Sequence, residues 1–158
     1  MARIFYDMDG TIADFNQGNM ANAVASMFNK GYFRTLPVIE QAQSTIARLV
    51  ELGHEIHILT ACVDSPYCEA EKREWLAEHF PMINPANWHF CPIGVSKAQW
   101  VKATTNDVLI DDYKANLIDW AKYGGMAIKK RTTRKISKYP MPCIYNHNQV
   151  FRYLEMME

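Results

Sequence analysis

The sequence predicts an α/β protein with a mostly parallel five-stranded sheet and helices on both of its faces. Short, β-rich apolar runs alternate along the chain with segments whose apolar residues recur at helical spacing. Gly and Pro residues stand at the ends of several of these segments. This alternation is typical of βα units, whose helices cover the faces of a parallel sheet. A length of 158 residues fits one domain.

Each predicted element follows from its local pattern. Residues 2–7 form a short β-rich run, and apolar positions over 20–28 then recur at helical spacing until Gly31. A second helical stripe covers 39–50 and stops at Gly53. The later elements, in chain order, are a strand over 54–60, a helix over 71–80, strands over 87–92 and 107–112, a helix over 114–123 and a strand over 126–130.

The segment after residue 130 has a weaker pattern. Residues 131–138 form a local basic run, for which a solvated surface is favoured over a nucleic-acid patch. Residues 143–145 are a candidate for a small edge strand. Apolar residues within 148–157 recur at helical spacing, which predicts a terminal helix that docks on the sheet.

The composition excludes several classes of protein. Lys plus Arg and Asp plus Glu each number 17, so the zero net charge gives no general attraction to nucleic acid or anionic membrane. No apolar run approaches the ~18 residues of a membrane span, and the N-terminus lacks the apolar core of a signal peptide. The four cysteines show no CxxC spacing, which is typical of reduced thiols. We therefore expect a cytoplasmic protein with no membrane partner and no stable nucleic-acid partner.

Three of the predicted strands end in polar residues, namely Asp7, Thr60 and the pair Asp111–Asp112. In a parallel sheet the carboxyl ends of the strands share one edge, and ligands bind outside that edge. The sequence therefore predicts that these residues, although distant in the chain, meet at one site.

The strongest local signal is the run DMDGT at residues 7–11. Residues two apart on an extended segment point the same way, so Asp7 and Asp9 can face one small volume. Gly10 removes a side chain where the backbone turns and approaches a ligand. Two neighbouring carboxylates repel each other, which indicates a divalent metal for one and proton transfer for the other. The alternative is a plain turn after a strand, with Asp and Gly as turn formers.

Asp111 and Asp112 follow a strongly apolar strand. Carboxylates at the end of a buried strand are costly unless they are paired or bound to a metal. Hard oxygen ligands together with a phosphate-type substrate favour Mg²⁺. The alternative is that Asp112 is the N-cap of the helix that begins at Lys114.

Two weaker signals fit the same site. The Thr60 hydroxyl and the backbone N–H of Ala61 suit a phosphate oxygen, although a lone threonine at a strand end is usually structural. Lys97 is predicted near the start of a short helix, where it can hold a phosphoryl group and offset the carboxylates. A lone lysine is usually a solvated surface residue. Lys97 is a candidate site residue only because it lies between Thr60 and the Asp pair in the sequence.

In this order along the chain, the motifs resemble those of the haloacid dehalogenase (HAD) superfamily of phosphohydrolases. More narrowly, IFYDMDGTIADF, ILTA followed by EKREWLAEHF, and VLIDDYKANLIDW are similar to the 5'(3')-deoxyribonucleotidase family. The resemblance implies a HAD-like, Rossmann-like sheet in a single domain over 1–158. It also implies a small helical cap after the first strand, inserted at about 16–36. Within that cap, Met20, Met27, Phe28 and Phe33 would line a lid, and core packing is the alternative for these residues.

The resemblance implies a Mg²⁺-dependent phosphomonoester hydrolase that acts through an aspartyl-phosphate. Asp7 would be the nucleophile. Asp9 would be the general acid and then the general base, and its backbone carbonyl would ligate the metal. Asp112 would be the direct metal ligand, with Asp111 beside it as a second ligand or its support.

The resemblance also implies a substrate. Thr60 and Lys97 would bind the transferring phosphoryl group, and Phe15 would stack on a base. A (deoxy)ribonucleoside monophosphate is favoured, while a sugar phosphate or a polynucleotide 3'-phosphate remains the alternative because the cap is small. The rival to an enzyme is a module that binds phosphate without turnover, and the presence of both Asp7 and Asp9 favours the enzyme. The sequence gives no indication of the oligomeric state.

Overall fold

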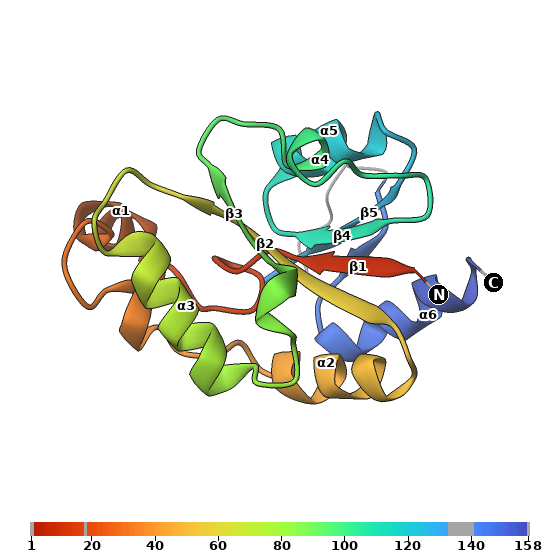
Figure 1. The fold of residues 1–158 in the computed structure, drawn as a ribbon, viewed down its shortest axis with the longest axis horizontal. Helices are drawn as coiled ribbons and strands as arrows, with labels where there is room; N and C mark the ends of the chain where they lie inside the picture. Colours follow the sequence, from red (N-terminus) through yellow and green to blue (C-terminus); the bar gives the residue numbers. More distant parts are fainter. Residues whose placement is uncertain (1, 18, 133–140, 158) are drawn as a thin grey trace.

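The computed structural model describes residues 2–17, 19–132 and 141–157, and it shows a parallel sheet between two layers of helices (Figure 1). The strand order is β3-β2-β1-β4-β5-β6, and each pair of neighbours is parallel. The α/β class predicted from the sequence is therefore confirmed. The strands are β1 (Arg3–Tyr6), β2 (Glu55–Cys62), β3 (Trp88–Pro92), β4 (Val108–Asp111), β5 (Met126–Lys130) and β6 (Cys143–Ile144).

The prediction of five strands is wrong by one, because the sheet has six strands within the described residues. The sixth strand, β6, lies at the edge beside β5, with Lys129 opposite Cys143 and Lys130 opposite Ile144. It falls within 143–145, which the sequence marked as a candidate edge strand. Two residues are too few for an alternating pattern to define a strand, so only the pairing with β5 establishes it.

The helices follow the apolar periods of the sequence. They begin or end within a few residues of the predicted positions; α3 starts before residue 71, and the terminal helix is shorter than 148–157. The α-helices are α1 (Met20–Ser26), α2 (Ala42–Glu51), α3 (Cys68–His79), α4 (Lys97–Trp100), α5 (Lys114–Ala121) and α6 (Val150–Glu155), and the 3₁₀ turns are η1 (Phe33–Thr35), η2 (Pro85–Asn87) and η3 (His147–Gln149).

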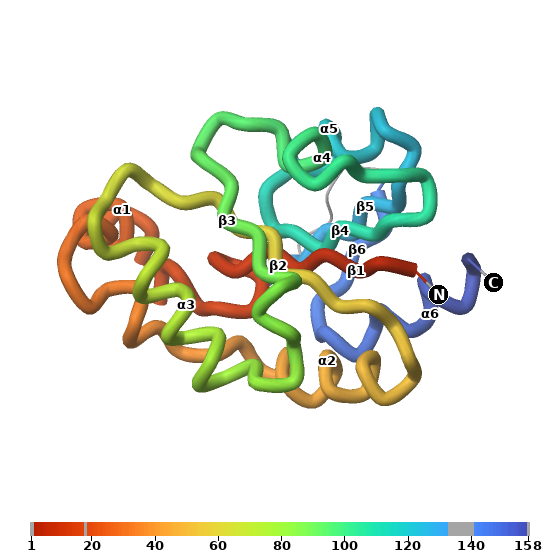
Figure 2. Tube along the Cα trace, in the orientation of Figure 1, coloured from red at the N-terminus to blue at the C-terminus, as the bar shows by residue number. Residues whose placement is uncertain are grey.

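The two faces of the sheet bury separate cores. Alternate residues of a strand point to opposite faces, so Ile4 and Tyr6 pack with α2, α3 and α6, whereas Phe5 packs with α4 and α5. Figure 2 shows α4 and α5 on one side of the sheet and α2 and α6 on the other. Because both faces are covered, β4 is buried along its whole length, as a central parallel strand requires.

Helix α3 holds the segment that follows β1. The Glu71 carboxylate is buried and accepts hydrogen bonds from the backbone N–H of Gly31 at 2.7 Å and of Arg34 at 3.2 Å. The indole N–H of Trp75 donates to the Leu36 carbonyl oxygen at 2.8 Å. The chain between β1 and α2, which contains α1 and η1, is therefore tied to the scaffold through polar contacts on one helix.

The C-terminal segment reaches back to the loop after β1. His147 is fully buried, and its Nε2 lies 2.8 Å from the Thr11 carbonyl oxygen. Because a carbonyl oxygen can only accept, Nε2 must carry the proton. Nδ1 is then an unprotonated nitrogen without a partner among the described residues. Burial lowers the pKa of His147 to about 4.

We expect His147 to make the fold sensitive to acid. Its folded-state pKa lies below the ordinary value of 6.5, so its contribution is fully present above about pH 6.5 and is lost as the pH falls toward 4. Between pH 7 and pH 4, the free energy of unfolding should fall by about 3 kcal/mol more in the native protein than in His147→Gln. Urea unfolding of both proteins at each pH measures this difference, and parallel pH curves would contradict it.

Two expectations about the surface have different outcomes. Residues 133–138 of the basic run lie outside the described residues, so its solvated character stays a prediction. Within the ranges that the structure describes, no helix combines the length and apolar character that crossing a bilayer requires.

Candidate active site

The structure brings three carboxylates together at the carboxyl edge of the sheet. Asp7 directly follows β1, Asp111 ends β4, and Asp112 follows it. One oxygen from each of these side chains lies within 4.8 Å of the other two. The register explains the convergence, because Tyr6 pairs with Ile110 and the next residue of each strand ends beside the other. Two aspartates distant in the sequence thus meet through one strand pairing.

Lys97 bridges two of these carboxylates. Its Nζ donates to Asp7 Oδ1 and to Asp111 Oδ2, both at 2.8 Å, and the side chain is only 4% exposed. Burial by itself would lower the pKa of Lys97, but the charges of Asp7 and Asp111 outweigh it and raise the pKa. Lys97 stands in α4, whose N-cap is Ser96. It is therefore a buried cation of the site and not a solvated surface lysine.

The neighbouring aspartates Asp111 and Asp112 have different surroundings. Asp111 is fully buried, and its oxygens accept hydrogen bonds from Lys97, from the Tyr113 backbone N–H at 2.9 Å and from Asn116 Nδ2 at 3.1 Å. Asp112 instead faces other acids. Burial, followed by the charges of Asp7 and Asp111, raises the pKa of Asp112 to about 9. The site thus holds Asp111 in a network of donors and leaves Asp112 in need of a cation.

The interpretation of Asp112 as a helix cap is wrong. The N-cap of α5 is Tyr113, and no side chain makes a capping hydrogen bond there. The backbone carbonyl of Asp112 accepts from Lys129 Nζ at 3.2 Å, which fixes the turn between β4 and α5. The Asp112 side chain is therefore available to the site.

Gly10 lets the loop after β1 approach Asp112. Its φ of +80° lies in the left-handed region that favours glycine. A Cβ at this position would stand 2.1 Å from Asp112 Oδ2. Both the backbone conformation and the lack of space therefore require glycine here, at the point where the sequence predicted a close approach of the backbone.

Lys72 of α3 is a site residue that the sequence analysis missed. Its Nζ donates to Asp9 Oδ2 at 2.9 Å, to Thr60 Oγ1 at 2.7 Å and to the Ala61 carbonyl oxygen at 2.8 Å. The ammonium also lies 4.9 Å from the centre of the Phe33 ring. Its side chain is 1% exposed, and its three N–H donors are all used.

A sequence signal for Lys72 did exist. Cys68, Lys72, Trp75 and Leu76 stand at i, i+4, i+7 and i+8, which is one face of a helix. All four are buried in the structure. A charged residue on an otherwise apolar helix face is the pattern that could have identified it.

The contacts of Lys72 decide what Thr60, Ala61 and Asp9 do in this structure. Thr60 is fully buried, and its hydroxyl accepts from the lysine. A direct contact of Thr60 or Ala61 with phosphate therefore stays a prediction. Asp9 turns its carboxylate toward Lys72, so one of its oxygens is held; the other, Oδ1, is buried without a partner among the described residues.

The acidic residues open into a cavity of about 210 Å³ whose lining is partly charged and partly apolar. Its charged lining residues are Asp7, Asp9, Lys97, Asp111 and Asp112. Its other walls carry apolar side chains, namely Phe15, Met27, Phe33, Val63 and Ile93.

Aromatic rings organise the apolar wall. The Phe15 ring stacks on Phe33 with the ring centres 6.2 Å apart and meets Tyr32 edge-on at 5.7 Å. The Tyr32 hydroxyl donates to the Phe15 carbonyl oxygen. Phe15 is therefore held in place beside the cavity, where the sequence resemblance places a base-stacking residue.

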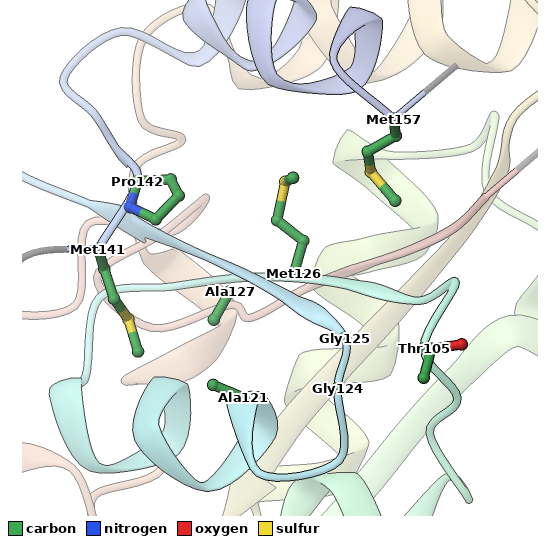
Figure 3. A pocket seen from close by; sticks show the side chains of 9 residues that line it. All are labelled: Thr105, Ala121, Gly124, Gly125, Met126, Ala127, Met141, Pro142 and Met157. Atoms are coloured by element: carbon green, nitrogen blue, oxygen red, sulfur yellow. The ribbon is translucent and has the colours of Figure 1, made fainter.

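A larger pocket, of about 360 Å³, has no comparable chemistry. It lies at the amino end of β5, and Figure 3 shows Met126, Met141 and Met157 around that strand. None of its lining side chains is ionisable. Ligand sites of parallel sheets lie at the carboxyl ends of the strands, so the smaller acidic cavity is the candidate active site.

We expect Asp112→Asn to stabilise the metal-free protein. The folded-state pKa of about 9 exceeds the ordinary 3.8, so the native protein loses stability as the pH rises between these values. Replacing the carboxyl by an amide that cannot ionise should raise the free energy of unfolding by about 2 kcal/mol at pH 8 in a chelator, as urea unfolding measures. Asp64→Asn on the exposed loop is the matched control, and an Asp112→Asn protein no more stable than this control would contradict the expectation.

The fold is that of the HAD class of proteins. A HAD-hydrolase from Bacillus subtilis, solved with bound magnesium, aligns over 97% of this chain and 98% of its own, with a TM-score of 0.69 and 13% identity. L-2-haloacid dehalogenase from Xanthobacter autotrophicus aligns over the full length of both chains, with a TM-score of 0.67 and 7% identity. These likenesses establish the HAD-like fold.

The chain belongs to the family described as 5' nucleotidase, deoxy (pyrimidine), cytosolic type C, whose family model matches residues 24–139. A Staphylococcus aureus protein named as a 5'(3')-deoxyribonucleotidase is 39% identical over 82 residues, which cover 52% of this chain and 41% of the relative. A Staphylococcus epidermidis protein of the same name is 41% identical over 61 residues, 39% of this chain and 34% of the relative. These matches thus span less than half the length of the relatives.

Proposed function

We propose that this protein is a Mg²⁺-dependent phosphomonoester hydrolase that acts on (deoxy)ribonucleoside monophosphates through an aspartyl-phosphate. The observation that carries the proposal is a cavity with both charged and apolar lining. Asp7, Asp112 and the cation Lys97 line it together with aromatic rings. A phosphate joined to a flat, largely apolar group has the same charged and apolar parts. Membership of the nucleotidase family supports this substrate class.

The donor set fits Mg²⁺. Carboxylate oxygens from Asp7, Asp111 and Asp112 converge, and Mg²⁺ prefers such hard ligands while taking few of them from the protein. Asp7, Asp112 and the backbone carbonyl of Asp9 would hold the ion, and Asp111 supports the site through Lys97. When bound, the ion supplies positive charge that lowers the repulsion between the carboxylates and the phosphate.

Asp7 is the nucleophile in this proposal. Two unit charges ~4 Å apart interact by ~4 kcal/mol at an effective dielectric near 20, so a carboxylate strongly repels a phosphate dianion. Lys97 holds Asp7 Oδ1 at 2.8 Å and Thr11 Oγ1 lies 3.3 Å from Asp7 Oδ2, which fixes the direction of the carboxylate. Attack forms a bond between an Asp7 oxygen and phosphorus, and the bond from phosphorus to the ester oxygen breaks.

Asp9 moves the proton. Lys72 holds Asp9 Oδ2, while the unpartnered Oδ1 can carry a proton into the site. This proton passes to the departing alkoxide, and the regenerated carboxylate then takes a proton from a water molecule. The water attacks phosphorus, which breaks the acyl-phosphate bond, frees Asp7 and releases inorganic phosphate.

Residues 16–36 form the small cap of this proposed enzyme. Met27 and Phe33 from this segment line the active-site cavity together with Phe15. Glu71 anchors the same segment through two backbone N–H groups. The cap therefore supplies the apolar wall against which a base would stack.

One observation favours the alternative substrate, a polynucleotide 3'-phosphate. A second cavity, of about 320 Å³, adjoins the first at Asp112 and is lined by Lys129, Lys130 and Arg131. Cations beside the active site suit a substrate with further phosphate groups. A sugar phosphate would use neither these cations nor the aromatic wall.

A phosphate-release screen separates these substrates. We expect nucleoside monophosphates to give higher kcat/KM values than sugar phosphates or 3'-phosphorylated oligonucleotides. Phe15→Ala should lower kcat/KM for nucleotides by about tenfold, because stacking on an aromatic ring contributes about 1–3 kcal/mol per base. It should leave sugar phosphates unaffected. Preference for 3'-phosphorylated oligonucleotides would support the alternative.

The aspartyl-phosphate predicts the behaviour of Asp7→Asn. Phosphate release should fall by about 10³-fold or more in this variant, since a catalytic nucleophile is lost. With Mg²⁺, beryllofluoride should form a stable adduct on the native protein, detectable by ¹⁹F NMR, and none on Asp7→Asn. Asp64→Asn controls for the loss of an acidic charge elsewhere. Full activity of Asp7→Asn would contradict the mechanism through an aspartyl-phosphate on Asp7.

The role of Lys72 in positioning Asp9 gives a leaving-group test. Lys72→Met should lower kcat for a nucleoside monophosphate by about 10²-fold, because its alkoxide needs a proton. The loss should be much smaller for p-nitrophenyl phosphate, whose leaving group departs without one. Lys122→Met, at an exposed lysine, is the control. Equal losses on both substrates would show that Lys72 has only a structural role.

A further inference from the structure

Cys62 and Cys68 form a pair of thiols beside the active site. Cys62 ends β2, and Cys68 is the first residue of α3, one turn before Lys72. Lys72 Nζ, one helical turn after Cys68, donates to the carbonyl oxygen of Ala61, the residue before Cys62, at 2.8 Å. The start of α3 therefore lies against the end of β2, and the two thiols interact. All four cysteines of the chain are free thiols. Cys62 is partly exposed, whereas Cys68 is buried.

The surroundings of the pair favour a thiolate. The hydrogen bond from Cys62 lowers the pKa of Cys68 to about 7 against the effect of burial, and the charge of Lys72 and the Val63 backbone N–H act in the same direction. The position of Cys68 at the N-terminus of α3 adds to this. The same hydrogen bond raises the pKa of Cys62. Near neutral pH the two sulfurs thus share one proton.

We propose that Cys62 and Cys68 are a redox modification site at which a hydroperoxide closes an intramolecular disulfide. The thiolate attacks the peroxide oxygen, the O–O bond breaks, and a sulfenic acid and a hydroxide or alkoxide result. The second sulfur attacks the sulfenic sulfur and expels its oxygen as water. Two thiols and hydrogen peroxide thereby give one disulfide and two waters, with two electrons passing from sulfur to oxygen. A dithiol reductant reverses the step.

The disulfide would act on the site through Val63 and Lys72. A disulfide fixes the sulfurs at about 2.05 Å, well inside the separation of two hydrogen-bonded thiols, so the loop 63–67 must shift. Val63 lines the active-site cavity, and its N–H contacts the Cys68 sulfur. Lys72 follows Cys68 by one helical turn and holds Asp9. Displacements of about 1 Å at such positions can cost up to about 10²-fold in rate. This consequence, unlike the disulfide itself, rests on the proposed function.

Peptide mapping tests the disulfide independently of any activity. Trypsin releases residues 49–72 as one peptide, which carries both cysteines and contains no internal Lys or Arg. After treatment of the full chain with hydrogen peroxide and alkylation, this peptide should carry no alkyl group, and reductant should restore two. Cys143, half-buried on β6, should stay alkylated and serves as the internal control. A peptide 49–72 that remains doubly alkylated, or whose cysteines link two copies of the chain, would overturn the proposal.

Phosphate release measures the consequence. We expect peroxide to lower kcat at least tenfold, with recovery in reductant. Cys62→Ser and Cys68→Ser should each resist this loss, and Cys143→Ser should lose activity like the native protein. Cys62 is partly exposed, so Cys62→Ser preserves the test if Cys68→Ser does not fold. A disulfide that leaves kcat unchanged would refute its effect on the site. A protein with no phosphatase activity before oxidation would instead refute the proposed function, with the peptide map still valid.

Discussion

The central constraint on this protein is negative charge gathered at one end of a low-dielectric sheet. Asp7, Asp111 and Asp112 lie within a few ångströms of one another, and burial, together with the charges of Asp7 and Asp111, raises the pKa of Asp112 to about 9. Lys97 offsets part of this charge from the α4–α5 side, and Lys72 holds Asp9 from the opposite face. The ammonium groups of both lysines donate hydrogen bonds to groups of the site. The two lysines thus pair with part of the negative charge of the site. A divalent cation would neutralise the negative charge that remains.

The sequence predicted the fold class and the meeting of the acidic residues because both depend on strand order and on a general rule of parallel sheets. Alternating apolar runs define β1 and β4, and their carboxyl ends must share an edge. The short strand β6 was only a candidate, since two residues form no pattern and depend on the neighbouring β5. The role of Asp112 as a possible cap was settled only by the backbone at Tyr113.

The contacts of Lys72 and Thr60 could not be predicted from the sequence alone. The apolar helix face around Lys72 indicates that the lysine is buried, but its partners, Asp9 and Thr60, become known only from the structure. Thr60 lies on the preceding strand, β2, whereas Asp9 lies in the loop after β1, 63 residues earlier in the chain. Likewise, a lone threonine at a strand end does not indicate which side chain will form a hydrogen bond with its hydroxyl. The local pattern therefore predicted the acidic residues, whereas the contact between the buried Lys72 and Asp9 depends on the tertiary structure.

Helix α3 makes two different sets of contacts through the adjacent residues Glu71 and Lys72. Glu71 binds the backbone of the segment that carries η1, and Lys72 binds Asp9 and Thr60 at the candidate active site. A single inserted or deleted residue ahead of them within α3 would rotate both by about 100° around the helix axis and release both contacts together. A change in the length of the loops before or after the helix would leave this phase unaltered. The rotational phase of α3 therefore couples the anchoring of the segment around η1 to the placement of Asp9.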